Sequence, residues 1–350
     1  MSMDLQQDIL FSAHHGLGKV LLNRPKALNA LTLEMCHALE AQLRAWTEDE
    51  TVAAVVVKGA GDKAFCAGGD IRRLSEAARA GDDYPYRFWA DEYRLNALIK
   101  HYPKPYLALI DGIAMGGGVG LSVHGRYRVV SEHALFAMPE TGIGFFPDVG
   151  GSYFLPRCPG EIGLYLGLTG HRLKAADMLY AGIATHLIHR LRLPAFEQAL
   201  AEAPGEVASV LARFAEDPGS APLAAQQAEI DDLFGRPSLE AVMAAVAAGR
   251  TEFARQTHEL LMRKSPTSLA LAFRAIRAGA SFDIDGCLRM EWRMASRVPR
   301  HLPDFHEGVR AVIIEKDNRP RWSPPLLADL DPAAIEMFFA PPEGGELELY

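Results

Sequence analysis

The chain has 350 residues, of which 49% are hydrophobic and 23% charged, and this composition excludes a disordered or fibrous protein. Lys and Arg number 36 against 44 Asp and Glu, so the net charge is -8 and general binding of nucleic acid is not expected. The 4 cysteines are widely spaced and form no CxxC pair, which indicates a reduced protein without a structural metal.

Targeting and membrane segments are not expected either. The N-terminal residues carry acids and no basic segment before an apolar block, so neither a secretory signal nor a transit peptide is predicted. The longest weakly polar stretch, residues 106–123, contains Asp111 and several glycines, which argues against a membrane span. We expect a cytoplasmic protein that does not bind membranes.

Strand-like apolar runs alternate with helix-like segments through the first half of the chain. Strands are predicted at 20–23, 52–58, 106–110, 126–130 and 134–137, and helices at 32–46, 86–100 and near 151–156. Such alternation predicts an α/β protein in which most strands are parallel.

The composition and periodicity of the sequence change at about residue 195. Ala-rich segments with helical periodicity follow, broken by Pro-Gly and Gly-Arg-Pro sequences. We therefore predict a core of residues 1–195, a helical C-terminal region of residues 196–340, and an acidic surface tail of residues 341–350.

Two glycine clusters each follow a predicted strand: Ala67-Gly68-Gly69-Asp70 and Met115-Gly116-Gly117-Gly118. Backbone without Cβ can approach a ligand closely, and N–H groups at a helix N-terminus carry partial positive charge. Two such turns facing each other could bind one developing oxyanion. Tight packing of strand against helix is an equally good reading of either cluster alone.

Other ligand and catalytic motifs are missing. The glycine spacing fits neither GxGxxG nor GxxxxGK[ST], so nicotinamide and nucleotide chemistry lose support. Residues 120–124 miss the GxSxG pattern of serine hydrolases at its last position, and the 12 histidines form no HExxH motif. We expect no metal site.

Glu140 and Asp148 lie in an apolar, glycine-punctuated segment. Neighbours of this kind desolvate a carboxylate rather than pair with it, and a desolvated carboxylate can act as a base or a nucleophile. Two carboxylates on one segment also fit acid/base catalysis. The alternative for Asp148 is that it caps a helix that begins near Val149.

Glu92 interrupts an apolar helical stripe formed by Phe88, Leu95 and Ile99. A buried, unpaired charge costs several kcal/mol or shifts its pKa, so Glu92 needs a partner or a ligand. A salt bridge to an arginine is the alternative.

These motifs together resemble the crotonase (enoyl-CoA hydratase/isomerase) superfamily. The resemblance rests on Asn23-Arg24-Pro25, Leu28-Asn29-Ala30-Leu31, and the segments 63–70 and 112–118. It is closer still to the 3-hydroxyisobutyryl-CoA hydrolase branch, through residues 116–125, 136–141, 146–151, 265–268 and 304–311. The similarity covers most of 15–190 and returns over 260–322.

The resemblance implies a spiral of ββα units with a helical C-terminal region. It implies an acyl-CoA substrate, no cofactor because coenzyme A is part of the substrate, and an oxyanion hole at the Gly69 and Gly117 N–H groups. Glu92, Gly117, Glu140 and Asp148 would contact the substrate, with Glu140 and Asp148 as the catalytic pair. Relatives often form trimers, which leaves a homo-oligomer open.

One departure separates hydrolysis from hydration. Hydratases of this superfamily carry a second glutamate three residues after the middle glycine of the triplet, where this chain has Gly120. The resemblance therefore favours hydrolysis of a short 3-hydroxyacyl-CoA, in valine degradation. Glu140 would attack the thioester to give an anhydride, or would activate a water. Hydration, isomerisation and a non-catalytic binding role are the alternatives.

Overall fold

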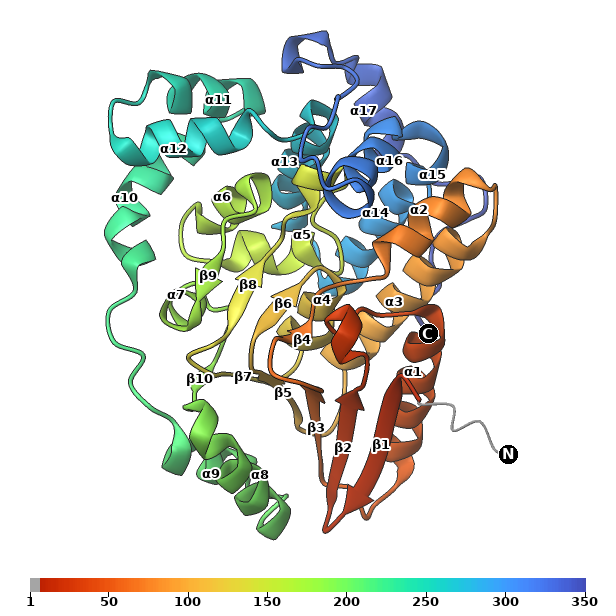
Figure 1. The fold of residues 1–350 in the computed structure, drawn as a ribbon, viewed down its shortest axis with the longest axis vertical. Coiled ribbons are helices and arrows are strands. Elements are labelled where there is room, and N and C mark those ends of the chain that lie inside the picture. The colour runs from red at the N-terminus through yellow and green to blue at the C-terminus, as the bar shows by residue number, and fades with distance from the viewer. Residues whose placement is uncertain (1–6) are drawn as a thin grey trace. The chain divides into compact units, whose positions relative to one another are not determined.

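The computed structural model describes residues 7–350 (Figure 1). Residues 1–6, with which the predicted core of residues 1–195 begins, lie outside the described residues. The chain divides into two compact units, which we treat separately. Unit 1 comprises the described residues up to Gly69, Leu95–Phe136 and Leu173–Ala221, and unit 2 comprises Asp70–Arg94, Ala137–Arg172 and Pro222–Tyr350.

Unit 1 contains a 6-stranded sheet whose order is β1 (Ile9–His14), β2 (Leu17–Leu22), β3 (Ala54–Gly59), β5 (Tyr106–Ile110), β7 (Tyr127–Val130) and β10 (His186–Leu187). The strands from β2 to β10 are parallel, and β1 pairs with β2 in antiparallel fashion. The predicted α/β class with largely parallel strands is confirmed. All of β5 is buried, as expected of a strand covered on both faces.

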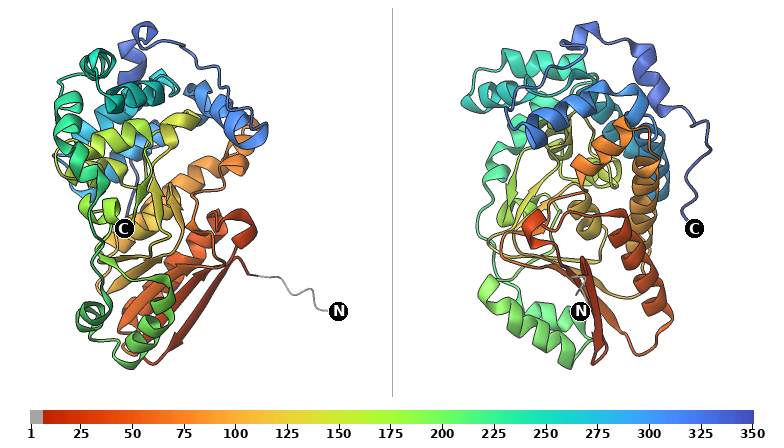
Figure 2. Two further views of the ribbon diagram at one scale, coloured as in Figure 1. Left: turned by 60° about the vertical axis from the view of Figure 1, so that its left-hand side comes forward. Right: turned by 45° about the vertical axis from the view of Figure 1, so that its right-hand side comes forward.

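A second, 4-stranded sheet has the order β4 (Ala64–Cys66), β6 (Ile113–Met115), β8 (Leu135–Ala137) and β9 (Leu173–Lys174). The helices of this part of the chain are α1 (Leu33–Glu48), α4 (Gly117–Val123), α7 (Ala175–Tyr180), α8 (Leu193–Glu202) and α9 (Val207–Phe214). Helices α8 and α9 bury Phe196, Leu200 and Leu211 with strand residues such as Leu17 and Leu107 in one apolar cluster. They lie beside the strands in every view of Figures 1 and 2.

Unit 2 is mainly helical. Its helices are α2 (Ile71–Arg79), the N-terminal part of α3 (Tyr84–Lys100), α5 (Gly151–Phe154), α6 (Ile162–Thr169), α10 (Pro222–Phe234), α11 (Leu239–Ala248), α12 (Glu252–Leu261), α13 (Pro266–Gly279), α14 (Ile284–Ala295), α15 (Val298–His301), α16 (Pro303–Val309) and α17 (Pro332–Phe339). The predicted helical C-terminal region is thus confirmed. The division of the sequence at residues 195 and 340 stays a prediction.

The C-terminal residues lie along the surface of unit 2. Leu347 and Leu349 are buried, and the Arg94 Nε donates to the Glu348 carbonyl at 2.9 Å. Arg293 of α14 forms an ion pair with Glu346. The predicted surface tail is therefore fastened by two buried leucines as well as by polar contacts.

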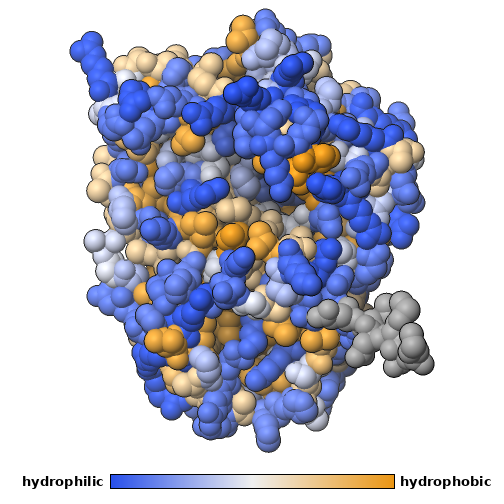
Figure 3. All heavy atoms as spheres, viewed as in Figure 1, coloured by the Kyte–Doolittle hydropathy of each residue, from blue (hydrophilic) through white to orange (hydrophobic). Residues whose placement is uncertain are grey.

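Hydrophilic side chains cover most of the face drawn in Figure 3, with apolar ones between them in smaller groups. Within residues 7–350, no helix has both the length and the apolar character needed to cross a membrane.

Candidate active site

The two glycine clusters of unit 1 lie side by side. Each follows one of the parallel strands β4 and β6, so both turns leave the same edge of the small sheet. A Cβ built on Gly68 would lie 3.7 Å from the Gly117 nitrogen. Gly68 and Gly116 have φ angles of 113° and 48°, which favour glycine.

The glycines of these turns serve two purposes. A Cβ on Gly118 would come within 2.0 Å of the Cys66 carbonyl oxygen, so Gly118 is required for close packing of α4 on β4. The Gly117 N–H stands at the first position of α4, where no intrahelical partner exists. Within the described residues, neither this N–H nor that of Gly69 donates to a backbone carbonyl. Both remain available to an oxygen acceptor.

Unit 2 brings the three predicted carboxylates together. Glu92 on α3 is 2% exposed, and Glu140 and Asp148 are each 5% exposed. Burial raises the pKa of Glu92 well above its ordinary value, and the nearby charges of Asp148 and Glu140 raise it further. The Glu92 Oε1 has no hydrogen-bond partner among the described residues, so the salt bridge considered for it is not found.

Glu140 begins the 3₁₀ turn Glu140–Ile143, which is packed tightly against α16. A Cβ on Gly144 would meet the Asp304 carbonyl oxygen at 2.0 Å, and one on Gly308 would meet Ile143 at 2.2 Å. Burial and then the charge of Asp148 raise the pKa of Glu140 well above its usual range. Its Oε2 is buried without a hydrogen-bond partner in the described chain. Glu140 is therefore a fixed, desolvated carboxyl group with one free oxygen.

Asp148 accepts a hydrogen bond from the Tyr93 hydroxyl, which lies 2.8 Å from its Oδ2. Burial raises the pKa of Asp148, and this hydrogen bond opposes the rise. Helix α5 begins later, with Gly150 as its N-cap and no side-chain cap, so Asp148 does not cap it. The next residue, Val149, has a φ of 51°, which strains a β-branched residue.

Sequence reasoning missed Glu291 of α14, which supports this strained segment. Its carboxylate is fully buried and accepts from the Gly150 N–H at 2.7 Å and from the Ser152 N–H at 2.9 Å. The Ser152 hydroxyl donates a third hydrogen bond at 2.6 Å. Burial nevertheless raises the pKa of Glu291 to about 8. Glu291 stands between Arg289 and Arg293 in the sequence, so it gave no local signal of this role.

Lys264 was also missed. Its Nζ lies 3.3 Å from a Cβ built on Gly142, two residues after Glu140, and 3.3 Å from one built on Gly170. Desolvation lowers the pKa of Lys264 to about 8, while the charge of Glu140 opposes the change. The available signal was its place directly before the family-like segment 265–268. Ser265 of that segment caps α13 and donates to Asp304 of segment 304–311 at 2.6 Å.

Buried aromatic rings lie on the same segments as the carboxylates. Trp89 of α3 stacks on Phe145 with ring centroids 5.4 Å apart, and Phe145 stacks on Phe146 at 4.4 Å. Phe305 packs edge-on against Trp89. In such apolar surroundings, neighbouring carboxyl groups cannot all ionise at neutral pH, so they can hold and exchange protons. Residues 7–350 contain no group of three or more His, Cys, Asp or Glu side chains that could hold a metal ion.

Comparison with known proteins gives a consistent family assignment. A family model described as enoyl-CoA hydratase/isomerase matches residues 17–339. The chain is 46% identical over 341 residues to the mitochondrial 3-hydroxyisobutyryl-CoA hydrolase of Xenopus tropicalis, covering 95% of this chain and 88% of that protein. It is 43% identical to the human protein of the same name, covering 93% of this chain and 87% of that one.

Two solved structures are similar over nearly the whole length. One is described as a carnitinyl-CoA dehydratase from Mycobacterium thermoresistibile, with a TM-score of 0.93, 39% identity, and 98% of this chain and 99% of that chain covered. The other is described as an enoyl-CoA hydratase from Rhodobacter sphaeroides, with a TM-score of 0.91, 38% identity, and 98% and 100% covered.

Proposed function

This chain belongs to the enoyl-CoA hydratase/isomerase family, and from that premise we propose that it hydrolyses 3-hydroxyisobutyryl-CoA or a similar short 3-hydroxyacyl-CoA to the free acid and CoA. It is an acyl-CoA thioester hydrolase with the crotonase fold. Relatives that share 40–46% of its residues over almost their whole length carry the name of that hydrolase. Valine degradation is the pathway that this substrate implies.

Glu140 is the observation that carries the proposal. A thioester hydrolase needs a carboxylate that can reach an acyl carbon, and Glu140 has a buried oxygen without a partner in residues 7–350. A hydratase would need a second acid/base group, and its expected position is Gly120 in α4. One attacking group and polarising N–H donors are sufficient for hydrolysis.

The proposed reaction begins at the thioester carbonyl carbon. A Glu140 oxygen forms a bond to this carbon, the C–S bond breaks, and the CoA thiolate leaves and takes up a proton. Water then cleaves the mixed anhydride and restores the Glu140 carboxylate. In the alternative, Glu140 removes a proton from a water molecule, which attacks the carbon directly.

The remaining predicted residues receive supporting roles. The Gly69 and Gly117 N–H groups are proposed to donate to the carbonyl oxygen as it becomes negative, each lowering the barrier by about 2.7–4 kcal/mol. Asp148 is proposed to bind the substrate hydroxyl or to assist the hydrolytic water. Glu92 is proposed to contact the substrate and to share a proton with its neighbours.

Hydration of an enoyl-CoA is the second candidate function, because both similar structures carry hydratase or dehydratase names. A thiol-release assay across a panel of short acyl-CoA esters, run beside a crotonyl-CoA hydration assay, decides between the two. We expect release from 3-hydroxyisobutyryl-CoA to exceed hydration by at least about 100-fold. Faster hydration than hydrolysis would contradict the proposal, and no turnover of either kind would favour a binding protein.

The covalent route has its own test. Hydroxylamine added during turnover converts an acyl-Glu140 anhydride to a glutamyl hydroxamate, which peptide mass spectrometry detects. We expect the modified peptide only when substrate is present, and none in the Glu140→Gln variant. A protein that turns over fully without acquiring the modification would indicate the water-activating route. The cytoplasmic location and a homo-oligomer stay predictions, and the relatives named above are mitochondrial.

A further inference from the structure

A small cationic pocket of about 290 Å³ lies in unit 1, away from the glycine turns. Its walls include His124 and Gly125, which follow the C-terminal end of α4, whereas Gly117 begins that helix. The pocket and the proposed oxyanion donors are therefore at opposite ends of α4. The cations on its walls are Lys100, Lys104, Arg126 and Arg128, and none of the described residues that line it is Asp or Glu.

Arg128 of β7 is half-buried, whereas Lys100 and Arg126 are exposed. Its guanidinium donates to the carbonyl oxygens of Ile183 at 2.8 Å, Gly125 at 3.0 Å and Gly182 at 3.2 Å. Burial lowers the pKa of Arg128. Carbonyl dipoles orient this charge without neutralising it, and no carboxylate in the described part of the chain pairs with it. Burial and then the charge of Arg128 lower the pKa of His186, so the positive field acts on its neighbours.

Lys104 is held in a similar way. Its Nζ donates to the Trp46 carbonyl at 2.5 Å and to the Asp49 carbonyl at 2.7 Å, at the C-terminal end of α1. An ammonium group has three donors, so one remains for a ligand. The Asp49 carboxylate accepts from Thr51 and does not line the pocket, but the charge of Lys104 helps to lower its pKa, so Asp49 offsets part of that charge. Arg126 is exposed and lies over the Tyr127 ring.

Helix termini offset only part of this charge. The C-terminal ends of α3 and α4 lie at the pocket, and the C-terminal end of α1 accepts hydrogen bonds from Lys104. Each of these helix ends carries roughly half a negative charge. Lys104, Arg126 and Arg128 together still exceed that total when the charge of Asp49 is added to it, even with Lys100 left aside. A surplus of charge with free donors on its walls calls for an anionic ligand.

We propose that this pocket binds a phosphate group, either free or as a small phosphate ester. A compact anion with several acceptor oxygens suits a pocket lined by the N–H donors of Arg128, Lys104 and Arg126. The volume admits a phosphate or pyrophosphate but is at the lower limit for larger ligands.

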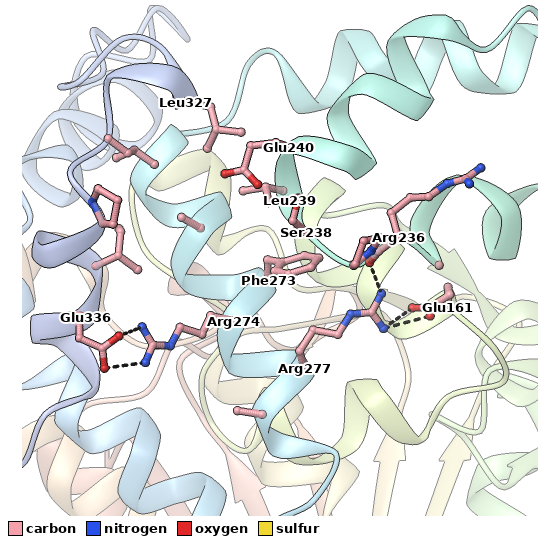
Figure 4. A pocket seen from close by; sticks show the side chains of 17 residues that line it. Glu161, Arg236, Ser238, Leu239, Glu240, Phe273, Arg274, Arg277, Leu327 and Glu336 are labelled. Atoms are coloured by element: carbon pink, nitrogen blue, oxygen red, sulfur yellow. Dashed lines mark hydrogen bonds and ion pairs between the residues drawn. The ribbon is translucent and has the colours of Figure 1, made fainter.

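A larger cavity in unit 2, of about 1010 Å³, is also lined by arginines, but carboxylates pair with two of them (Figure 4). There Arg277 pairs with Glu161 at 2.8 Å and Arg274 with Glu336 at 2.5 Å. These two arginines are thus neutralised by carboxylates of the same wall, whereas Arg236 pairs with Asp232 outside it. The pocket of unit 1 differs because Arg128 and Lys104 donate to backbone carbonyl oxygens and no carboxylate of the described residues lines that pocket.

Calorimetric titration with inorganic pyrophosphate at constant ionic strength tests the proposal. We expect saturable binding to one site, weakened about tenfold in Arg126→Ser and further in Arg126→Glu. Arg213→Ser is the matched control, because Arg213 is an exposed arginine of α9 in the same unit. This substitution removes the same charge as Arg126→Ser. Its affinity should stay within about twofold of the unsubstituted protein. Inorganic phosphate and glycerol 3-phosphate then distinguish a free anion from an esterified one.

Saturating CoA should leave pyrophosphate binding unchanged, because the pocket is separate from the proposed thioester site. Competition by CoA would overturn the assignment of a separate site. The absence of saturable binding, or equal losses in Arg126→Ser and Arg213→Ser, would overturn the pocket itself. These outcomes do not depend on thioester hydrolysis, so they are distinguishable from a failure of the proposed function.

Discussion

Lys264 is the residue that we expect to set the ionisation of Glu140. Glu140 must lose its proton before it can attack, yet burial and Asp148 both raise its pKa, and Lys264 lowers it. Replacing Lys264 with Met removes the stabilising charge, so the pKa of Glu140 rises. The acidic limb of the pH profile of kcat should move upward by about one pH unit. Rates measured from pH 5 to 9 check this.

The conservative variant separates charge from packing in this prediction. Lys264→Arg keeps a cation beside the Glu140 turn and should keep the limb near its original position. A general structural role would instead lower kcat at every pH in both variants without moving the limb. That result would contradict the electrostatic role of Lys264.

Glu291 is expected to act on stability and on the position of Asp148. Glu291→Gln replaces one of two acceptor oxygens with a donor, which would face either the Gly150 N–H or the Ser152 donors. Above pH 8, where Glu291 is ionised, the free energy of unfolding should fall by about 2 kcal/mol, because a buried donor is left unsatisfied. Urea unfolding measures the loss, and Glu259→Gln, on the exposed side of α12, is the control. Equal stability of the two variants would contradict this role.

At the scale of elements, the packing of α4 on β4 positions the Gly117 N–H. Gly118→Ala places a Cβ 2.0 Å from the Cys66 carbonyl oxygen, and backbone must move to admit it. We expect a loss of about 1–3 kcal/mol in stability and a lower kcat in the soluble fraction. Gly205→Ala is the matched control, since nothing lies within 4 Å of its added Cβ. Thermal unfolding and thiol release measure both effects, and an unaffected Gly118→Ala would contradict the packing argument.

Local patterns were sufficient to predict the central strands β2, β3, β5 and β7 of the large sheet and helix α1. The apolar run at 106–110 coincides with β5, and the helical spacing from Leu33 onward coincides with α1. The stripe on α3 is buried as predicted, with Phe88 and Ile99 at 1% and 2% exposure. The antiparallel strand β1 was missed because most of its residues are exposed, so that its side chains show little apolar pattern.

The carboxylate cluster could be predicted only in part, because it is assembled from segments far apart in the chain. Glu92, Glu140 and Asp148 each stood out as an acid in apolar surroundings. Glu291 and Lys264 are ordinary charged residues in their own helices or loops, and only folding brings them to the other segments. Their roles depend on burial and contacts, which a local pattern does not encode.

For the whole molecule, the buried acids make stability depend on pH in a direction opposite to that of most salt-bridged proteins. Glu92, Glu140 and Glu291 have pKa values raised by burial, that of Glu291 to about 8. Between the unfolded pKa near 4.5 and the folded pKa, the folded state binds more protons than the unfolded state. The free energy of unfolding therefore falls as pH rises through this window.

The interval from pH 6.5 to 8.0 isolates this effect. Burial lowers the pKa of His186 and His306, so these histidines reduce the free energy of unfolding only when the pH falls below about 6.5. Desolvation lowers the pKa of Lys264 to about 8, so this lysine changes the pH dependence of stability only above about pH 8. Each acid that titrates contributes a slope of up to about 1.4 kcal/mol per pH unit. We expect a loss of about 2 kcal/mol or more over the interval by urea unfolding, and a smaller loss in Glu92→Gln. A stability that is constant or rises from pH 6.5 to 8.0 would mean that these carboxyl groups are ionised in the folded protein, with counter-charges that neutralise them.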